Sequence, residues 1–278
     1  EHASAYIRQL ASSDELLRTT ALDYLLRNKI VSPEILPALK TWIDSILADG
    51  DPPRIPENTI LLAAIQGAEG DSLIAETILQ CDSWGAFPYD CLASAYTGLD
   101  LAHPVMAAVA RGLDDRFVSQ DDPCRIGSAY WKIGTEAMRS RYRTTVLTST
   151  DTNAVWFGWP LIAYDPECLP RLDGMTDAES ARLVRGMLLP LTGTGASDAN
   201  TSLAANADGV RRWVARVLES PDEDLRNSFL YVCDKTVMRE ILAADPALLE
   251  RIERAARERD EKDGMPPRRP EGDKAVEK

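Results

Sequence analysis

The chain has 278 residues, 45% of them hydrophobic and only 6% aromatic, which is enough apolar material for one elongated domain or two compact ones. Its formal net charge of −13 argues against a general nucleic-acid binder and against an anionic membrane surface, since most of the protein would repel phosphate. An acidic chain favours basic protein partners or simply solubility, and no apolar run approaches the roughly 18 residues of a membrane span.

The first predicted helix begins in the phrase Ser12–Leu22, which recurs near the other end of the chain as Ser220–Leu230. Ser, Asp, Glu, Leu, Arg and Leu fall at identical offsets in the two copies. Each copy has a Ser followed three residues later by Glu, the pattern of a reciprocal capping box, and each opens an apolar stretch at helical spacing. The start of an amphipathic helix is therefore specified twice, which favours helical hairpins over an enzyme core.

Capped prolines mark further helix starts along the chain. A side-chain oxygen before proline can accept from a free amide of the first turn, and proline at that point loses no helical hydrogen bond. Such pairs occur at Ser32-Pro33, Asp122-Pro123, Asp165-Pro166, Ser220-Pro221 and Asp245-Pro246. The apolar period predicts helices over 35–47, 57–66, 71–81, 88–97 and 102–113. Alternating runs with a hairpin turn are missing, so we expect an all-α fold.

The next predicted helix spans 124–148, with Gly134 as a candidate break, and it reverses the charge of the preceding chain. It carries a net charge of +4, whereas residues 1–123 carry −11. Four of its cations, which we call the basic ridge, fall almost on one line of an ideal helix: Arg125, Lys132, Arg139 and Arg143. The basic ridge could meet an acidic peptide, a phosphate or a nucleic-acid backbone. The alternative, which we favour, is that it pairs with acidic neighbours in the same protein.

Aromatic residues follow the basic ridge in the helix predicted over 152–163. Rigid aromatic side chains beside arginines are the usual composition of a binding hot spot. The same side chains would serve as core where the repeats lose regularity, which is the safer interpretation for most of them. Trp159, next to Pro160, is the one that we most expect at a surface. The partner-binding residues predicted from the sequence are Arg125, Lys132, Arg139, Arg143, Trp156 and Trp159.

The last third of the chain contains helices predicted over 176–191, 210–218, 222–234 and 246–260. Between the first two of these helices, Thr192–Ser202 is polar and rich in Gly, Ser and Thr, so we expect a flexible loop. From residue 257 the chain becomes dense in charge and includes Pro266-Pro267 and Pro270, which predicts a frayed helix and then a flexible tail. The expected organisation is a helical-repeat domain over 1–256 and a charged tail over 257–278.

The repeated phrase also carries a family resemblance. Asp14-Glu15-Leu16-Leu17-Arg18 and Asp222-Glu223-Asp224-Leu225-Arg226 each place an Asp in a turn before an apolar residue and an Arg. In this the chain resembles the HEAT/armadillo class of helical repeats, and the two copies, 208 positions apart, leave room for five steps of roughly 40–47 residues. The resemblance implies irregular antiparallel helical hairpins that form a right-handed solenoid. Residues 50–175 contain no comparable copy.

Few residues in the chain could carry catalysis. Nucleophilic catalysis of the Ser–His–Asp or Cys–His type needs a histidine as base, and because His2 lies at the terminus it would depend on His103. We expect His103 instead to cap or pack at a helix start. The acidic pairs at 114–115 and 121–122 are expected to be solvated or capping. The turn at Gly193 has neither the Lys nor the preceding strand of a phosphate-binding loop. We therefore predict no catalytic residue.

The cysteines are odd in number, scattered and without a CxxC pair: Cys81, Cys91, Cys124, Cys168 and Cys233. With only two histidines in the chain, this pattern favours reduced core thiols of a cytoplasmic protein over a disulfide framework or a zinc site. We predict no metal and no cofactor. The sequence begins at Glu1 rather than at Met, so we expect that the chain has been trimmed, and the part removed could include a signal peptide.

The function expected from these features is non-catalytic binding of a protein or peptide by a helical-repeat surface, as an adaptor, a scaffold or an inhibitor of the immunity type. In one variant the acidic first half holds a basic partner. The alternative function is a helical-repeat protein, or an enzyme, that binds nucleic acid or a phosphate ligand through residues 125–143. Nucleic acid is the less expected partner because of the net charge. The sequence specifies neither the partner nor the oligomeric state.

Overall fold

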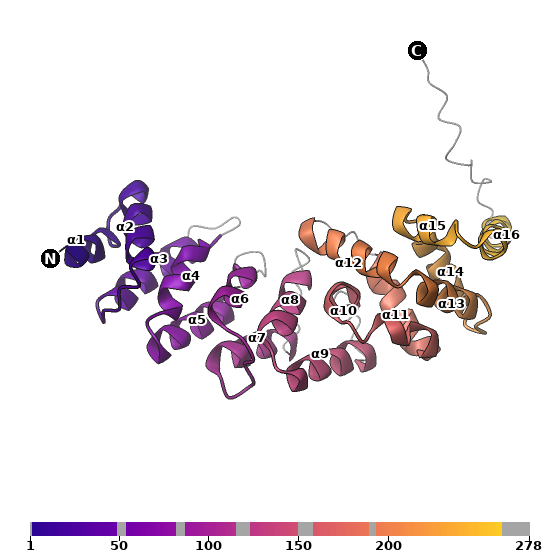
Figure 1. Ribbon diagram of the computed structural model, residues 1–278, viewed down its shortest axis with the longest axis horizontal. Helices are drawn as coiled ribbons and strands as arrows, with labels where there is room; N and C mark the ends of the chain where they lie inside the picture. The colour runs from indigo at the N-terminus through magenta and orange to yellow at the C-terminus, as the bar shows by residue number, and fades with distance from the viewer. Residues whose placement is uncertain are drawn as a thin grey trace, which may run out of the picture. The chain divides into compact units, whose positions relative to one another are not determined.

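The structure is a computed structural model that describes residues 2–48, 54–81, 87–114, 123–149, 158–188 and 193–262; within these ranges the side chains at 112, 114, 123–125 and 193–196 are not described. Every regular element in the described part of the chain is a helix, and the backbone makes one isolated bridge, between Leu99 and Gly134. This confirms the predicted all-α fold (Figure 1). None of the described helices is both long enough and apolar enough to cross a membrane.

The chain forms two compact units, Glu1–Asp165 (unit 1) and Pro166–Lys278 (unit 2). The helices of unit 1 are α1 His2–Gln9, α2 Glu15–Arg27, α3 Ile35–Ala48, α4 Glu57–Ala64, α5 Ala68–Gln80, η1 Tyr89–Cys91, α6 Leu92–Ala95, α7 Pro104–Asp114, α8 Pro123–Ile133, α9 Glu136–Thr148 and α10 Gly158–Tyr164. Those of unit 2 are η3 Leu169–Gly174, α11 Asp177–Leu188, α12 Gly193–Ala205, α13 Ala207–Leu218, α14 Glu223–Cys233, α15 Thr236–Leu242 and α16 Pro246–Lys262. The prediction of one helical-repeat domain over 1–256 remains a prediction.

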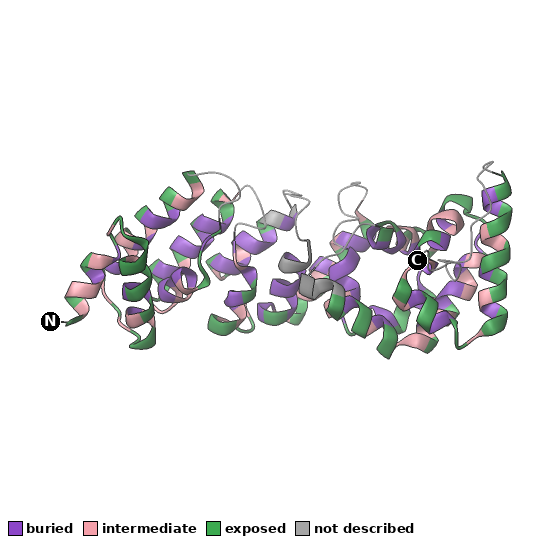
Figure 2. Cartoon of the chain, turned by 90° about the horizontal axis from the view of Figure 1, so that it is seen from above, coloured by how far each residue is buried: buried purple, intermediate pink, exposed green. Residues whose placement is uncertain are grey.

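Unit 1 is built from helices that pack mainly on helices close in sequence: α2 on α4, α4 on α5, α5 on α7, and α8 on α10. The α4–α5 hairpin turns at Gly67, whose φ of +76° suits glycine. One turn later Gly70 brings the two helices together, because a Cβ there would lie 1.8 Å from the main-chain oxygen of Ala63. Buried apolar residues recur at helical spacing along these helices. Figure 2 colours the buried residues of each helix purple.

Unit 2 packs α11 against α14 and α13 against η3, with α16 lying on α14. Its centre is Trp213 of α13, which is fully buried and meets the ring of Phe229 edge-on at 4.7 Å. The indole N–H of Trp213 donates to Ser180 Oγ of α11 at 3.1 Å. The large apolar surface of Trp213 is thus buried and its one polar atom is satisfied.

The predicted helix over 124–148 is two helices, broken at Gly134 as the sequence suggested. Thr135 caps α9 by accepting from the amide of Met138, and its own amide donates to the carbonyl of Leu99 at 2.9 Å. The amide of Leu99 in turn donates to the carbonyl of Ile133. The free backbone groups at the break are therefore satisfied by a neighbouring segment rather than by a continuous helix.

The prediction of a flexible loop over Thr192–Ser202 is wrong, because the helix α12 runs from Gly193 to Ala205. Ala199 and Leu203, four residues apart, are fully buried and fix one face of the helix. The Thr201 hydroxyl donates to the carbonyl of Ser197 one turn earlier, so a polar side chain that could have competed with the helix is bonded within it.

At the C-terminal end α16 continues to Lys262, beyond the predicted domain boundary at 256. Arg259 and Asp260 near its end are both buried. The flexible tail that the sequence predicts after this point lies outside the described residues.

Candidate functional site

The basic ridge is divided between two helices. Lys132 lies on α8, and Arg139 and Arg143 lie on α9 after the break at Gly134. The prediction that these cations lie along one line of a single helix is therefore wrong. The side chain of Arg125 and the whole of Trp156 lie outside the described residues.

Arg143 is held inside unit 1 by Asp165. Its Nε donates to Asp165 Oδ2 at 2.5 Å and its Nη2 donates to Oδ1 at 2.8 Å, a bidentate pair. The side chain of Arg143 is only 12% exposed and that of Asp165 is 0% exposed. Arg143 thus joins α9 to the residue that follows α10, and its guanidinium is turned toward the interior.

The other two described cations of the basic ridge also have partners within unit 1. The ammonium of Lys132 lies 3.4 Å from Asp90 Oδ1. Arg139 donates to the carbonyl of Trp131 at 2.8 Å and lies 3.6 Å from Glu136. These contacts support the favoured alternative, in which the ridge balances acids of the same protein. Lys132 and Arg139 keep partly exposed side chains, and their role in partner binding stays a prediction.

Trp159 is 3% exposed, so the expectation that it lies at a surface is wrong. It is the second residue of α10, a helix that packs closely on α8. A Cβ on Gly127 of α8 would lie 2.0 Å from the Cβ of Pro160, the next residue after Trp159. This close approach of α8 and α10 encloses the indole in the interior.

A cluster of three polar side chains in unit 1 was missed from the sequence because its members are far apart in the chain. The Tyr96 hydroxyl donates to Asp71 Oδ1 at 2.5 Å, and His103 Nε2 lies 3.3 Å from Asp71 Oδ2. Burial, and next the hydrogen bond to Asp71, raises the pKa of Tyr96. Among the described residues no Ser or Cys is hydrogen-bonded to His103. The cluster ties together α5, the residue after α6 and the start of α7, which matches the packing role expected for His103.

Cys91 and Cys233 are expected to resist thiol reagents in the folded chain. Burial raises the pKa of both thiols to about 12, with Glu57 and then Asp90 adding to the effect at Cys91. At pH 8 only about 1 in 10⁴ of such thiols is ionised, and the thiolate is the nucleophile. Pulsed alkylation with peptide mass spectrometry should show slow labelling of both in buffer, fast labelling in urea, and earlier labelling of the half-buried Cys81. Equal rates with and without urea would contradict this expectation.

The α14–α16 hollow, a depression of about 380 Å³ in unit 2, gathers most of its charge from arginine and lysine. Five cations and two carboxylates line it, over an apolar part that includes Leu218 and Leu230. The charged lining residues are Arg226, Arg251, Arg254, Arg259 and Lys262, with Glu223 and Glu258. This hollow was not predicted from the sequence, because the residues from 257 onward were assigned to a frayed helix and then a flexible tail.

Three cations at the rim of the α14–α16 hollow have partners that are exposed to solvent. Arg251 lies 3.1 Å from Glu219 and Arg254 lies 3.1 Å from Glu250, while Lys262 pairs with Glu223. All six side chains are more than two-fifths exposed. Water screens such pairs, and each stabilises the fold little. A ligand that carries its own carboxylates could replace these partners at small cost.

One wall of the α14–α16 hollow is rigid. The Arg259 guanidinium makes two hydrogen bonds to Asp260 Oδ1, at 3.0 and 2.6 Å, within the buried part of α16. Its carbon Cζ also lies 4.1 Å from the centre of the Tyr231 ring, a cation–π contact. Arg226 is fixed as well, because it donates to the carbonyl of Ser220. The hollow thus combines arginines held by hydrogen bonds in its wall with solvent-exposed ion pairs at its rim.

No group of three or more His, Cys, Asp and Glu side chains that could hold a metal ion occurs in the described parts of the two units. Comparison of the chain with protein-family models, with curated proteins and with solved structures found no match.

Proposed function

We propose that this chain is a non-catalytic module of the cytoplasm that binds an acidic segment of a partner protein in the α14–α16 hollow. The observation that carries the proposal is the gathering of five cations around one depression in a chain whose net charge is −13. Three further acids, Glu219, Glu250 and Asp260, pair with lining cations from outside the lining. Only Asp260 of these is buried, so the other two can be displaced.

A peptide with Asp or Glu beside an apolar residue suits the chemistry of the α14–α16 hollow. A guanidinium presents two parallel N–H groups to a carboxylate, which gives direction as well as energy. Leu218 and Leu230 offer an apolar contact below the arginines. Opposite charge on the partner also speeds its approach.

We infer further that the helices of each unit stack as irregular hairpins of the HEAT/armadillo type, in a right-handed solenoid. Support comes from the sequential contacts in unit 1 and from the two copies of the repeated phrase, which both begin a helix with an Asp cap. Solenoids present surfaces to partners and need no catalytic residue for that purpose.

Replacing Arg254 with glutamate is expected to abolish capture of the partner, whereas Arg257→Glu is not. Both residues are exposed on α16, but only Arg254 lines the α14–α16 hollow. We expect at least a tenfold loss of the partner with Arg254→Glu, because the change places a like charge opposite an acidic ligand. Capture from a lysate of the source cells on each immobilised variant, with quantitative mass spectrometry, measures the loss.

The matched variant separates the hollow from a general charge effect. Identical partner lists for the parent, Arg254→Glu and Arg257→Glu would contradict the proposal. Binding of single- or double-stranded oligonucleotides near 50 mM salt that is lost in Arg254→Glu would instead favour the alternative function, a nucleic-acid ligand. Circular dichroism of each variant checks that the helices are intact.

A further inference from the structure

A second hollow in unit 2 adjoins the α14–α16 hollow. This α13–α16 hollow has a volume of about 350 Å³ and is lined by α13 and by the start of α16. Three of its lining residues are cations: Arg211, Arg212 and Arg251. Arg251 also lines the α14–α16 hollow, so the two hollows meet at this side chain.

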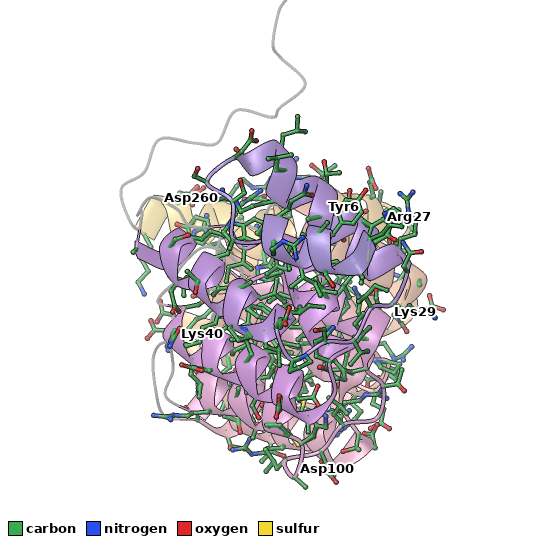
Figure 3. The ribbon with its side chains drawn as sticks, turned by 90° about the vertical axis from the view of Figure 1, so that its left-hand side faces the viewer. Tyr6, Arg27, Lys29, Lys40, Asp100 and Asp260 are labelled. Atoms are coloured by element: carbon green, nitrogen blue, oxygen red, sulfur yellow. The ribbon has the colours of Figure 1, made fainter. Side chains whose placement is uncertain are left out.

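One face of α16 runs along both hollows. Its lining residues include a series that recurs every three or four positions from the first turn of the helix to the last: Leu248, Arg251, Ala255, Arg259 and Lys262. From residue 248 to residue 262 the helix axis advances about 21 Å, at 1.5 Å per residue. Arg259 is held in this face by Asp260, which Figure 3 labels. The face of α16 is therefore continuous from one hollow to the other.

The opposite wall comes from α13 and α14, which both contact α16 (Figure 1). On α13 the lining positions again fall at helical spacing, from Asp208 through Arg211 and Ala215 to Leu218. Leu218 lines the α14–α16 hollow, where Arg226 of α14 joins it. The two hollows are thus parts of one groove, which we call the α16 groove.

Cations line both walls of the α16 groove. α13 and α14 supply Arg211, Arg212 and Arg226, and α16 supplies the other four cations of the α14–α16 hollow and its continuation. Four carboxylates line the same groove, and one of them, Asp245, accepts from an amide in the first turn of α16 at 3.0 Å. The lining therefore keeps an excess of positive charge in a chain whose net charge is −13.

The α13–α16 hollow repeats the arrangement found in the α14–α16 hollow, with one arginine held by the fold and one in an exposed pair. Arg211 donates to the carbonyl of Ile241 at 3.1 Å and also to Asp208. The Nε of Arg212 donates to Asp173 Oδ2 at 2.7 Å, with the two side chains 61% and 36% exposed. Such an exposed pair stabilises the fold little, so a carboxylate of a ligand could replace Asp173 at Arg212.

We propose that the acidic partner segment is an extended stretch of about seven residues that fills the α14–α16 hollow, crosses Arg251 and continues into the α13–α16 hollow, where Arg212 binds its carboxylates. An extended chain advances about 3.3 Å per residue, so seven residues match the length of the groove. Its successive side chains point to opposite sides, which brings neighbouring acids to the cations of both walls. A helical segment would turn most of its carboxylates away. This inference rests on the proposed function and adds the length, the conformation and a second contact of the ligand.

The test compares two blocked, fluorescein-labelled peptides, heptaglutamate and triglutamate, by fluorescence anisotropy with the full chain near 50 mM salt. When extended, the first spans about 23 Å and reaches both hollows, whereas the second spans about 10 Å and fills one. Heptaglutamate should bind at least tenfold more tightly. Arg212→Glu should remove most of this gain and leave triglutamate binding within twofold of the parent value. Arg254→Glu should weaken both peptides.

A matched variant and a crosslink separate the proposed contact from general attraction by charge. Arg257→Glu changes the net charge equally, but Arg257 is exposed on α16 and lines neither hollow, so binding of heptaglutamate should stay within twofold. Heptaglutamate with a photoreactive group at each end should label residues 208–215 as well as residues 223–230 or 254–262. Circular dichroism of each variant checks that the helices are intact.

The outcomes distinguish this inference from the proposed function. If triglutamate binding depends on Arg254 but heptaglutamate is no tighter, or if labelling is confined to 223–230 and 254–262, then the inference is wrong and the proposed function stands. If neither peptide depends on Arg254, both fail. An oligothymidylate of eight nucleotides that binds more tightly than heptaglutamate, and weakens in both Arg212→Glu and Arg254→Glu, would assign the α16 groove to a nucleic-acid backbone and overturn the inference.

Discussion

An Arg143→Met variant is expected to lose about 3 to 5 kcal/mol of the unfolding free energy of unit 1, because removal of one partner strands the other charge in the interior. The stranded group is the carboxylate of Asp165, which is 0% exposed and receives two hydrogen bonds from the guanidinium. Urea titration read by hydrogen-exchange mass spectrometry of peptides from α9 and α10 reports on unit 1 alone.

Arg139→Met is the matched control, since Arg139 lies one turn earlier on the same helix and pairs with the exposed Glu136. Its loss should be near 1 kcal/mol. The double variant Arg143→Met/Asp165→Asn should recover part of the stability, because it leaves no unpaired carboxylate. Equal losses of unfolding free energy for the two single variants would show that burial does not determine how much the Arg143–Asp165 pair stabilises unit 1. A large loss for Arg143→Met would also mean that charge reversal at Arg143 cannot test partner binding by the basic ridge, because such a variant would lose the fold around Asp165.

Gly70→Ala is expected to destabilise the α4–α5 hairpin by about 1 to 3 kcal/mol or more, although alanine is the better helix former. The new Cβ would lie 1.8 Å from the main-chain oxygen of Ala63 and 2.8 Å from its carbonyl carbon, and a backbone group cannot rotate away as a side chain can. The two helices would have to separate, which opens the interior formed with α7. The midpoint of thermal unfolding and the exchange rates of α4 and α5 amides measure the effect.

Gly209→Ala provides the opposite case on another helix. Gly209 lies in the first turn of α13, where the nearest atom that a Cβ would meet beyond its own turn of backbone is the Leu169 carbonyl oxygen, at 3.5 Å. There the change should be neutral or stabilise by up to about 1 kcal/mol. If both substitutions stabilise the protein, then the α4–α5 approach is looser than the structure has it.

Local patterns in the sequence predicted the helices well because their determinants are local. The helix starts after Ser12 and Ser220 and the break at Gly134 were predicted, but the residues that cap α2 and α14 are Asp14 and Asp222 rather than the predicted serines. No helix was predicted at α1 or α15, and the single helix predicted over 88–97 is the short pair η1 and α6. A loop was predicted in place of α12, because Gly, Ser and Thr favour a loop by composition. Burial of Ala199 and Leu203 outweighs that preference, and burial is a property of the folded unit.

The candidate sites were predicted less well because charge spacing along a helix does not reveal a partner elsewhere in the chain. Arg143 and Asp165 are 22 residues apart, and Asp71 and His103 are 32 apart. For the basic ridge, the favoured alternative was pairing with acids of the same protein, and the contacts of Lys132, Arg139 and Arg143 support it. On composition, Arg259 was assigned to the frayed end of a helix and Lys262 to a tail, whereas α16 continues to Lys262 and Arg259 is buried beside Asp260.

The bond between Arg143 and Asp165 has a consequence for synthesis of the chain. Asp165 is the last residue of unit 1, so the partner of Arg143 leaves the ribosome 22 residues after it. At 5–20 residues per second that delay is about 1 to 4 s, far longer than a helix needs to form. Until then the guanidinium of Arg143 can pair with Glu136 of the same helix, but the buried pair with Asp165 can form only after the last residue of unit 1 has emerged. The buried pair between Arg143 and Asp165 is thus among the last contacts of unit 1 that synthesis allows to form.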